Sequence, residues 1–209
     1  KLLEGDNEVT VLGRNSYPEF KNLVPCVKAD VRDSSAMVLA LKEQEVVFHT
    51  AAIPRIWGDY NEFYSTDVKG TENVISACCE NRVKKLIYTS SPSVVFSELD
   101  MEDIDEQTPY PDKYLCHYPK TKAMAEKLVM GANGSRGLAT VCIRPHLIWG
   151  PGDPHIFPRL VERAKNKKLV RVGNGTNLVD MIYIDNAVEA HIKASEKLSL
   201  GSPIAGKCY

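Results

Sequence analysis

The sequence predicts an α/β protein built on a Rossmann-like, doubly wound parallel sheet with a small C-terminal lobe. Short apolar runs of strand type alternate with segments of helical apolar spacing over nearly all 209 residues. Apolar strands separated by helices are typical of a parallel sheet that is covered on both faces. Right-handed crossovers between such strands wind the helices onto the two faces, which gives the doubly wound arrangement.

The expected elements follow one another along the chain. Runs rich in β-branched and apolar residues predict strands at residues 8–12, 24–27, 45–49, 84–90, 138–143 and 181–184. Apolar residues recurring three or four positions apart predict helices at residues 34–42, 60–81, 118–130, 155–166 and 186–198. Asp33 or Ser34 supplies an N-cap for the first of these helices.

Composition argues against several classes of function. The formal net charge is −1, so no basic surface for nucleic acid or for an anionic membrane is expected. No apolar run approaches the ~18 residues of a membrane span, and the N-terminus does not resemble a signal peptide. Six cysteines without CxxC spacing and five histidines without metal-ligand spacing predict no metal site. We expect reduced, mostly buried thiols and a cytoplasmic protein.

A YxxxK motif at Tyr118 and Lys122 is the leading chemical signal. The chain holds a second copy at Tyr17 and Lys21, so the spacing alone is uninformative. The second copy lies in a proline-containing loop, whereas Tyr118 opens a predicted helix with Pro119 at a position that tolerates it. Positions i and i+4 share one face of a helix. An ammonium group one turn away would lower the pKa of a tyrosine and suit it to proton transfer at a carbonyl.

A hydroxyl that holds the substrate oxygen would complete such a site. The segment TSSPS at residues 89–93 follows the predicted strand at residues 84–90 and precedes Tyr118 by a polar loop. Because this segment ends a predicted strand and comes before Tyr118 in the chain, we favour a functional role for its hydroxyls over a purely structural Ser/Pro-rich turn.

These motifs, taken together, resemble a known family, the extended short-chain dehydrogenase/reductases. The matching blocks, in order, are ADV at 29–31, VFHTAA at 47–52, VKGTENV at 68–74, YTSS at 88–91, YPKTK at 118–122, IRP at 143–145 and WGPG at 149–152. The runs at residues 51–58, 144–154 and 173–180 are similar to the 3β-hydroxysteroid dehydrogenase-like branch. That branch includes sterol-4α-carboxylate 3-dehydrogenases and bacterial 2-alkyl-3-oxoalkanoate reductases.

The resemblance implies an NAD(P)-dependent oxidoreductase that interconverts a secondary alcohol and a ketone. It implies an apolar substrate of the 3β-hydroxysteroid, sterol or long-chain β-keto acid type. Ser91 matches the catalytic serine, Tyr118 the acid/base, and Lys122 the partner that also bonds the nicotinamide ribose. The resemblance also implies three groups of cofactor contacts. Asp30 and Val31 match the pair that contacts the adenine, and Pro145 with His146 flanks the nicotinamide. Thr50, Ala51 and Ala52 line the cofactor after the third predicted strand.

One position, Asp67, departs from the family pattern, and another, Arg14, bears on the choice between NAD and NADP. Asp67 stands where the family usually has Asn before its GT motif. The first predicted strand is followed by Gly13 and Arg14 rather than by an acidic residue, which would bond the ribose 2′-hydroxyl. A small residue followed by a guanidinium suits a 2′-phosphate, so we expect NADP, with NAD as the alternative.

Both ends of the sequence resemble interrupted elements. Residues 1–4 have the character of a last helical turn, and residues 206–209 stop where a strand would begin. The first strand and phosphate loop are therefore expected to be absent. Glycines at 131, 134 and 137 mimic a phosphate loop, but they join a helix to a strand, so we interpret them as a helix stop and turn. We expect a dinucleotide-binding domain over residues 1–150, and over residues 151–209 substrate-lobe elements interleaved with the last strands and helices of the Rossmann-like layer.

Two alternative functions remain open at this point. A nucleotide-sugar epimerase or dehydratase shares the Ser, Tyr and Lys set but needs polar diphosphate contacts, whereas residues 155–169 carry several apolar side chains. A non-catalytic dinucleotide-binding sensor commonly loses the Tyr or the Lys, and both are present here. The expected partner is a small apolar alcohol or ketone, with a homodimer among the expected assemblies. Membrane contact is expected only through a segment beyond Tyr209.

Overall fold

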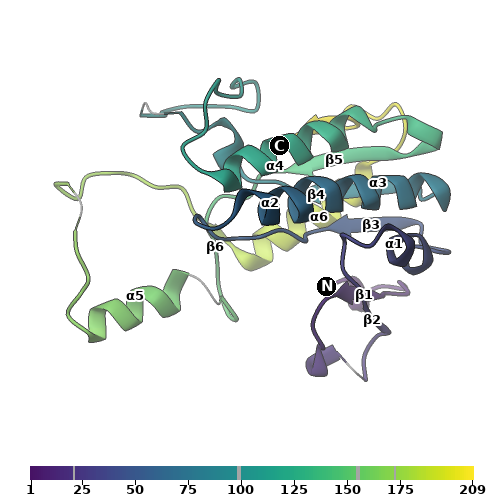
Figure 1. Ribbon diagram of the computed structural model, residues 1–209, viewed down its shortest axis with the longest axis horizontal. Coiled ribbons are helices and arrows are strands. Elements are labelled where there is room, and N and C mark those ends of the chain that lie inside the picture. Colours follow the sequence, from purple (N-terminus) through teal and green to yellow (C-terminus); the bar gives the residue numbers. More distant parts are fainter. Residues whose placement is uncertain (21, 98–99, 154–155, 172) are drawn as a thin grey trace.

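A four-stranded parallel sheet forms the centre of the molecule (Figure 1). The computed structural model describes residues 1–20, 22–97, 100–153, 156–171 and 173–209. The sheet has the order β3-β4-β5-β8, formed by β3 (Val46–His49), β4 (Lys85–Thr89), β5 (Ala139–Ile143) and β8 (Lys207–Cys208). All three pairings are parallel, as the alternation of strands and helices predicts.

Two smaller parallel pairs accompany the main sheet. One joins β1 (Val11–Gly13) to β2 (Cys26–Lys28), and the other joins β6 (Ile148–Trp149) to β7 (Ile182–Tyr183). The described part of the chain shows no hydrogen-bonded ladder between β1 and β3. In the strand order 3-2-1-4-5-6 of a doubly wound fold, one central strand separates the equivalents of these two.

Six α-helices connect the strands of the described chain: α1 (Ser34–Ala40), α2 (Tyr60–Phe63), α3 (Gly70–Glu80), α4 (His117–Gly131), α5 (Ile156–Lys165) and α6 (Ile184–Lys197). A π-helical segment, η3 (Tyr64–Lys69), joins α2 to α3, so the helix expected at residues 60–81 is continuous but contains a π-bulge. Four short 3-10 turns complete the described elements: η1 (Leu2–Glu4), η2 (Pro18–Phe20), η4 (Pro92–Val95) and η5 (Ser135–Gly137).

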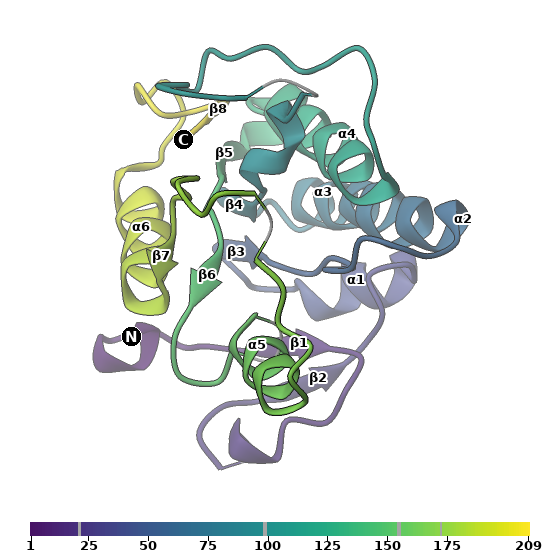
Figure 2. The same cartoon turned by 90° about the vertical axis from the view of Figure 1, so that its left-hand side faces the viewer.

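The two faces of the main sheet bury different side chains. Leu86, Tyr88 and Cys142 point into a core shared with α1, α3 and α4. Ile87 and Val141 point the other way, into a core closed by α6. This alternation along β4 and β5 follows from the two-residue period of a strand. Figure 2 shows α6 on the opposite side of the sheet from α3 and α4, which confirms the doubly wound arrangement.

Most expected boundaries agree with the structure to within one to three residues. Asp33, not Ser34, caps α1, since its carboxylate accepts the Ala36 N–H. The first strand begins at Val11 rather than at residue 8, because β1 pairs only with the short β2. Gly134 and Gly137 adopt positive φ angles of 88° and 89° after α4, which confirms that this glycine run ends a helix. The helix expected from residue 155 starts at 156 in α5, and His155 lies outside the described residues.

The cysteines depart from expectation in their burial. All six are free, but only Cys78 and Cys142 are buried, so the expectation of mostly buried thiols is wrong. Cys26 lies on the short strand β2, whose three residues are all exposed. Within the described ranges, no helix is both long enough and apolar enough to cross a membrane.

A buried ion pair joins α4 to the segment after β5. The Arg144 guanidinium donates to both carboxylate oxygens of Glu126, at 2.9 and 2.6 Å, and Tyr110 donates to the same carboxylate at 2.6 Å. Burial alone would raise the pKa of the Glu126 carboxyl, but the hydrogen bonds from Arg144 and Tyr110 outweigh burial and lower that pKa. The pair therefore fixes α4 relative to the end of β5.

Replacing Glu126 by Gln should destabilise the protein by about 3–5 kcal/mol, because a buried guanidinium then loses its counter-charge. Urea unfolding at neutral pH measures this change. The matched control is Glu45→Gln, which breaks an exposed ion pair with Lys84 and should leave the unfolding midpoint unchanged. Equal midpoints for both variants would show that the Arg144 pair does not hold α4 in place.

Candidate active site

The candidate residues follow the carboxyl ends of successive parallel strands. Arg14 follows β1, Asp30 follows β2, and Thr50 follows β3. Ser91 follows β4, and Pro145 and His146 follow β5. Because parallel strands present their carboxyl ends at the same end of a sheet, the residues after β3, β4 and β5 gather at one end of the main sheet, where open α/β sheets bind ligands, and those after β1 and β2 share the corresponding end of the smaller pair. Tyr118 and Lys122 reach the same edge from α4.

Ser91 and Tyr118 lie close together at this end of the sheet. The Ser91 hydroxyl is near enough to the Tyr118 phenol to lower the pKa of the tyrosine. The Ser91 hydroxyl also caps η4 by accepting the Ser93 N–H at 3.2 Å, and it lies 2.8 Å from the Ser93 hydroxyl. The turn after β4 therefore places Ser91 beside the first turn of α4. The structure brings these two candidate residues together.

Lys122 is 2% exposed and lies one helical turn after Tyr118. Its ammonium donates to the Thr89 carbonyl at 2.6 Å, at the end of β4, and lies 4.1 Å from the centre of the Tyr88 ring. Burial lowers the pKa of Lys122 to about 8, and the Asp67 carboxylate acts in the opposite direction. Lys122 is thus held at the end of β4 as well as on α4.

The pKa of Tyr118 differs from the sequence-based expectation. Burial raises this pKa above its usual value, the nearby Ser91 hydroxyl lowers it, and the Asp67 charge raises it further. The expectation that Lys122 brings the pKa down is not met in this structure, because the Lys122 amine is directed at Thr89 and Tyr88. Burial of the phenol outweighs the stabilising contacts.

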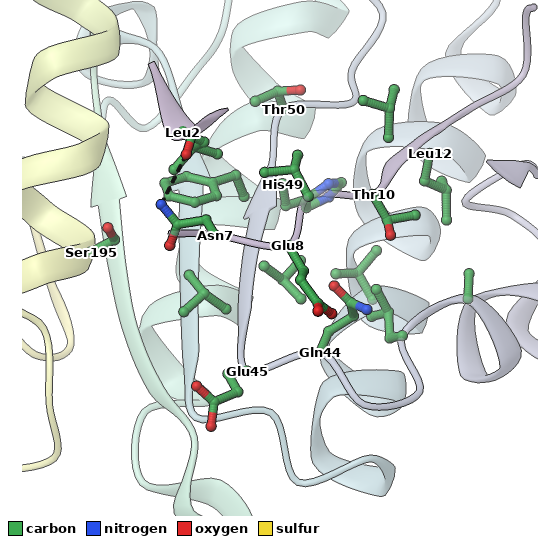
Figure 3. A pocket seen from close by; sticks show the side chains of 18 of the residues that line it. Leu2, Asn7, Glu8, Thr10, Leu12, Gln44, Glu45, His49, Thr50 and Ser195 are labelled. Atoms are coloured by element: carbon green, nitrogen blue, oxygen red, sulfur yellow. Dashed lines mark hydrogen bonds between the residues drawn. The ribbon is translucent and has the colours of Figure 1, made fainter. Parts of the chain in front are cut away.

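A cavity of about 670 Å³ lies where the order of the parallel strands is interrupted. It is lined by residues 6–12, by β3 and the two residues after it, Thr50 and Ala51, and by parts of α1. Figure 3 shows Asn7, Glu8 and Thr10 of the N-terminal segment crossing beside His49 of β3. Thr50 and Ala51 are both exposed, whereas Ala52 is half-buried. Thr50 and Ala51 thus line this cavity at the carboxyl end of β3.

The residues after β1 and β2 lie close enough for their charges to interact. The exposed Arg14 lowers the pKa of Asp30, although the main cause is a hydrogen bond from Arg32. Arg32 donates to both oxygens of Asp30, at distances of 2.6 to 3.1 Å. Val31 is buried and lines the cavity beside β3. The Asp30 carboxylate is therefore already engaged, whereas the Arg14 side chain is solvent-exposed.

His146 lies on the Ser91 side of the strand edge. Its ring meets the Phe96 ring edge-on, with centroids 5.8 Å apart, and Phe96 ends the η4 turn that Ser91 caps. The His146 carbonyl accepts the Ile182 N–H at 3.1 Å, which joins this segment to β7. Pro145 and His146 are both half-buried. The segment after β5 thus runs alongside the serine.

Two histidines that sequence analysis left without a role support this edge. The His191 Nδ1–H donates to the Ala187 carbonyl at 2.7 Å, so Nε2 accepts from the Thr89 hydroxyl at 2.8 Å. His49 lies 2.9 Å from the Thr71 hydroxyl, and burial lowers the pKa of His49 to about 3, which keeps the ring neutral. Neither contact has a sequence signal, because the partners lie 102 and 22 positions apart.

Comparisons with known proteins agree on fold and family. The sequence profile of the 3-beta hydroxysteroid dehydrogenase/isomerase family matches residues 8–209. The chain is 41% identical to a 2-alkyl-3-oxoalkanoate reductase of Shewanella oneidensis, over 100% of this chain and 56% of that protein. It is 44% identical to the human sterol-4-alpha-carboxylate 3-dehydrogenase, decarboxylating, over 81% of this chain and 46% of that protein. The chain spans about half the length of these relatives.

Solved structures share the fold at lower identity. The UDP-glucuronic acid 4-epimerase of Bacillus cereus, in complex with UDP-glucuronic acid and NAD, superposes with a TM-score of 0.83. It is 23% identical and covers 99% of this chain and 70% of its own. At this identity the likeness concerns the fold, which confirms the Rossmann-like prediction.

The buried Lys122 should make folding stability depend on pH. In the unfolded chain its pKa is near 10.5 and in the fold about 8, so between these values only the unfolded state keeps the proton. Raising the pH through this window therefore favours the fold. Relative to Lys122→Met, the wild-type free energy of unfolding should rise by about 3 kcal/mol from pH 8 to pH 10.5. Urea unfolding over this pH range measures the difference. The same comparison of the wild type with Lys84→Met, at an exposed lysine, is the control. A flat difference for Lys122 would contradict its burial as a charged group.

Proposed function

The chain belongs to the 3-beta hydroxysteroid dehydrogenase/isomerase family, and on that premise we propose that the whole protein is a nicotinamide-dependent oxidoreductase. It interconverts a secondary alcohol and a ketone on a sterol, 3β-hydroxysteroid or long-chain β-keto acid type of substrate. The observation that carries this proposal is the proximity of Ser91 and Tyr118 at the carboxyl edge of the sheet, with Lys122 one turn further along α4. The named activities of the relatives, a 2-alkyl-3-oxoalkanoate reductase and a sterol dehydrogenase, support the same reaction class.

The three side chains divide the proton chemistry between them. In ketone reduction, Tyr118 gives its hydroxyl proton to the oxygen of the nascent alkoxide, and in alcohol oxidation it takes that proton. The Ser91 hydroxyl, which lies near Tyr118, holds the same substrate oxygen. The Lys122 ammonium, held at the end of β4, is the proposed partner of the cofactor ribose. A bound nicotinamide supplies or accepts the hydride.

The residues at the strand ends fit a dinucleotide. The exposed Thr50 and Ala51, with Ala52 behind them, leave room at the end of β3. Asp30 and Val31 line the adenine side, and Pro145 with His146 flanks the nicotinamide. Residues 1–150 then form the dinucleotide-binding domain together with α6 and β8, and the other elements of residues 151–209 contribute to the substrate lobe.

NADP(H) is the proposed cofactor, since Arg14 presents an exposed guanidinium after β1. A guanidinium matches the geometry and charge of a 2′-phosphate. Asp30, the nearby carboxylate, is neutralised by Arg32 and so repels a phosphate less than a free carboxylate would. NAD stays the alternative, because the structural relative from Bacillus cereus is described with NAD.

The proposed substrate is apolar because α5 presents an apolar surface. Phe157, Leu160 and Val161 on α5 are exposed, and Figure 1 shows this helix standing apart from the sheet. A nucleotide-sugar substrate would call for polar groups around its diphosphate. The relatives by sequence are a reductase and a dehydrogenase, whereas the epimerase likeness is one of fold.

A substrate screen tests the reaction class. The whole protein is mixed with NADPH or NADH and with ketosteroids, β-keto acids or UDP-sugars, and cofactor oxidation is followed by absorbance. Turnover of a ketosteroid or β-keto acid is the expected result. Conversion of a UDP-sugar without net cofactor oxidation would favour the epimerase, and tight cofactor binding without any turnover would favour a sensor.

Tyr118→Phe should lower kcat by about 10²–10⁴-fold with little change in KM, because the proton donor is lost while the ring is kept. Steady-state kinetics with the best ketone of the screen measure this effect. The chain supplies a matched control in Tyr17→Phe, which alters the tyrosine of the second YxxxK motif and should keep wild-type kcat. Comparable kcat values for the two variants would remove Tyr118 from the mechanism.

Arg14→Ala should reduce the preference for NADPH over NADH by about tenfold, because a charge-assisted bond to the 2′-phosphate is lost. The ratio of kcat/KM for NADPH to that for NADH measures cofactor preference, and it does not depend on the fraction of active enzyme. Arg14→Lys keeps the charge but loses the planar, bidentate donor geometry of the guanidinium, so an intermediate ratio is expected. An unchanged ratio in both variants would assign cofactor choice to another residue.

A further inference from the structure

We propose that Asp67 is a positioning residue that holds α4 against the loop after β3 and sets the pH dependence of the Tyr118 and Lys122 pair. The inference rests on the proposed function for its kinetic consequence, but not for its structural and electrostatic parts. Asp67 lies in the π-helical segment η3, one turn before α3. π-Bulges inside helices are frequent at functional sites.

Asp67 joins three segments that are distant in sequence. One carboxylate oxygen accepts the Ile53 N–H at 3.0 Å, which fixes the loop that runs on from Thr50. The other oxygen lies 2.8 Å from the Thr121 hydroxyl, on α4 between Tyr118 and Lys122. Asp67 is 1% exposed and Thr121 is fully buried, so water does not replace either bond. The carboxylate thereby couples the cofactor side of the edge to the catalytic helix.

The Thr121 hydroxyl has one hydrogen and three acceptors within reach. Besides Asp67, it lies 3.1 Å from the His117 carbonyl and 3.2 Å from the Tyr118 carbonyl. When Asp67 is ionised, Thr121 donates to it. When Asp67 is protonated, the acid donates to Thr121, which then donates to a carbonyl of α4. The protonated acid therefore repeats the donor and acceptor pattern of an asparagine, whereas the ionised acid adds a buried charge.

That charge faces titratable groups on two neighbouring elements. From α4 it faces Lys122 and Tyr118, and from β4 it faces Tyr88. Burial raises the pKa of Asp67, while hydrogen bonds from Thr121 and Ile53 and the Lys122 charge hold it down.

The remaining titratable neighbours are neutral or engaged elsewhere. On β3, the neutral His49 bonds Thr71, whose hydroxyl donates to the Asp67 backbone carbonyl at 2.6 Å. Glu62 of α2 pairs with Arg55, and Glu72 of α3 pairs with Lys69. Among the described residues around Asp67, Lys122 is thus the cation that interacts with its carboxylate.

The direction of the effect on the catalytic pair follows from the sign of the charge. Ionised Asp67 favours the ammonium of Lys122 and disfavours the phenolate of Tyr118, so it raises the pKa of both groups. An asparagine at this position keeps both hydrogen bonds and removes the charge. Both pKa values then fall. Alcohol oxidation, which uses the phenolate as base, becomes active at lower pH.

The test compares Asp67→Asn with the wild-type whole protein. The pH dependence of kcat/KM for alcohol oxidation should move about one unit toward lower pH in the variant. The melting temperature should change little, since the amide preserves the contacts with Ile53 and Thr121. Thr121→Val is the matched control, because it removes the hydroxyl but keeps the carboxylate of Asp67. It should lower the melting temperature, and its pH dependence of kcat/KM should stay at the wild-type position. Thr121→Ser should restore the melting temperature.

A second readout is independent of turnover. In protein labelled with ¹³C at lysine Cε, the Lys122 resonance is identified by its loss in Lys122→Met, and its titration midpoint should fall below about 8 in Asp67→Asn. An unchanged midpoint in a variant that melts normally overturns the inference, whether or not the protein reduces any ketone. A lowered midpoint in a protein that turns over no substrate supports the role of Asp67 while refuting the proposed function.

Discussion

The buried ammonium of Lys122 is the constraint on which the geometry of the edge depends. A charged group that is 2% exposed must be met by acceptors, and the Thr89 carbonyl, the Tyr88 ring and the Asp67 charge meet it. These partners fix α4 against the end of β4. Tyr118, one turn earlier on the same face, is then placed beside Ser91 in the turn that follows that strand.

The same face of α4 continues to Glu126, one turn after Lys122. Its carboxylate is fully buried and binds Arg144 after β5, so α4 is held at the ends of two neighbouring strands. Positions 118, 122 and 126 thus divide one helix face into a reactive phenol, a buried cation and a buried anion. Each group has a partner on another element, so a shift of α4 by one residue would leave two buried charges unpaired.

Family and fold contribute different information about function. Relatives at 41% and 44% identity place the chain in a dehydrogenase family, whereas an epimerase at 23% identity superposes over 99% of it. The fold therefore supports several chemistries, and a likeness of fold does not choose between them. The chain spans about half of the named relatives, and exposed apolar side chains are found on α5 and in the segments around it.

The sequence by itself determined the order of strands and helices, because two-residue and helical apolar periods are local properties of the chain. It also placed Ser91, Tyr118 and Lys122 on a strand end and a helix start, since turn residues and a proline mark those boundaries. Only the tertiary structure decided what each group faces. The contacts of Asp67 with Ile53 and Thr121, of His191 with Thr89 and of Glu126 with Arg144 join residues 14 to 102 positions apart. The raised pKa of Tyr118 likewise comes from burial, which no spacing of residues reveals.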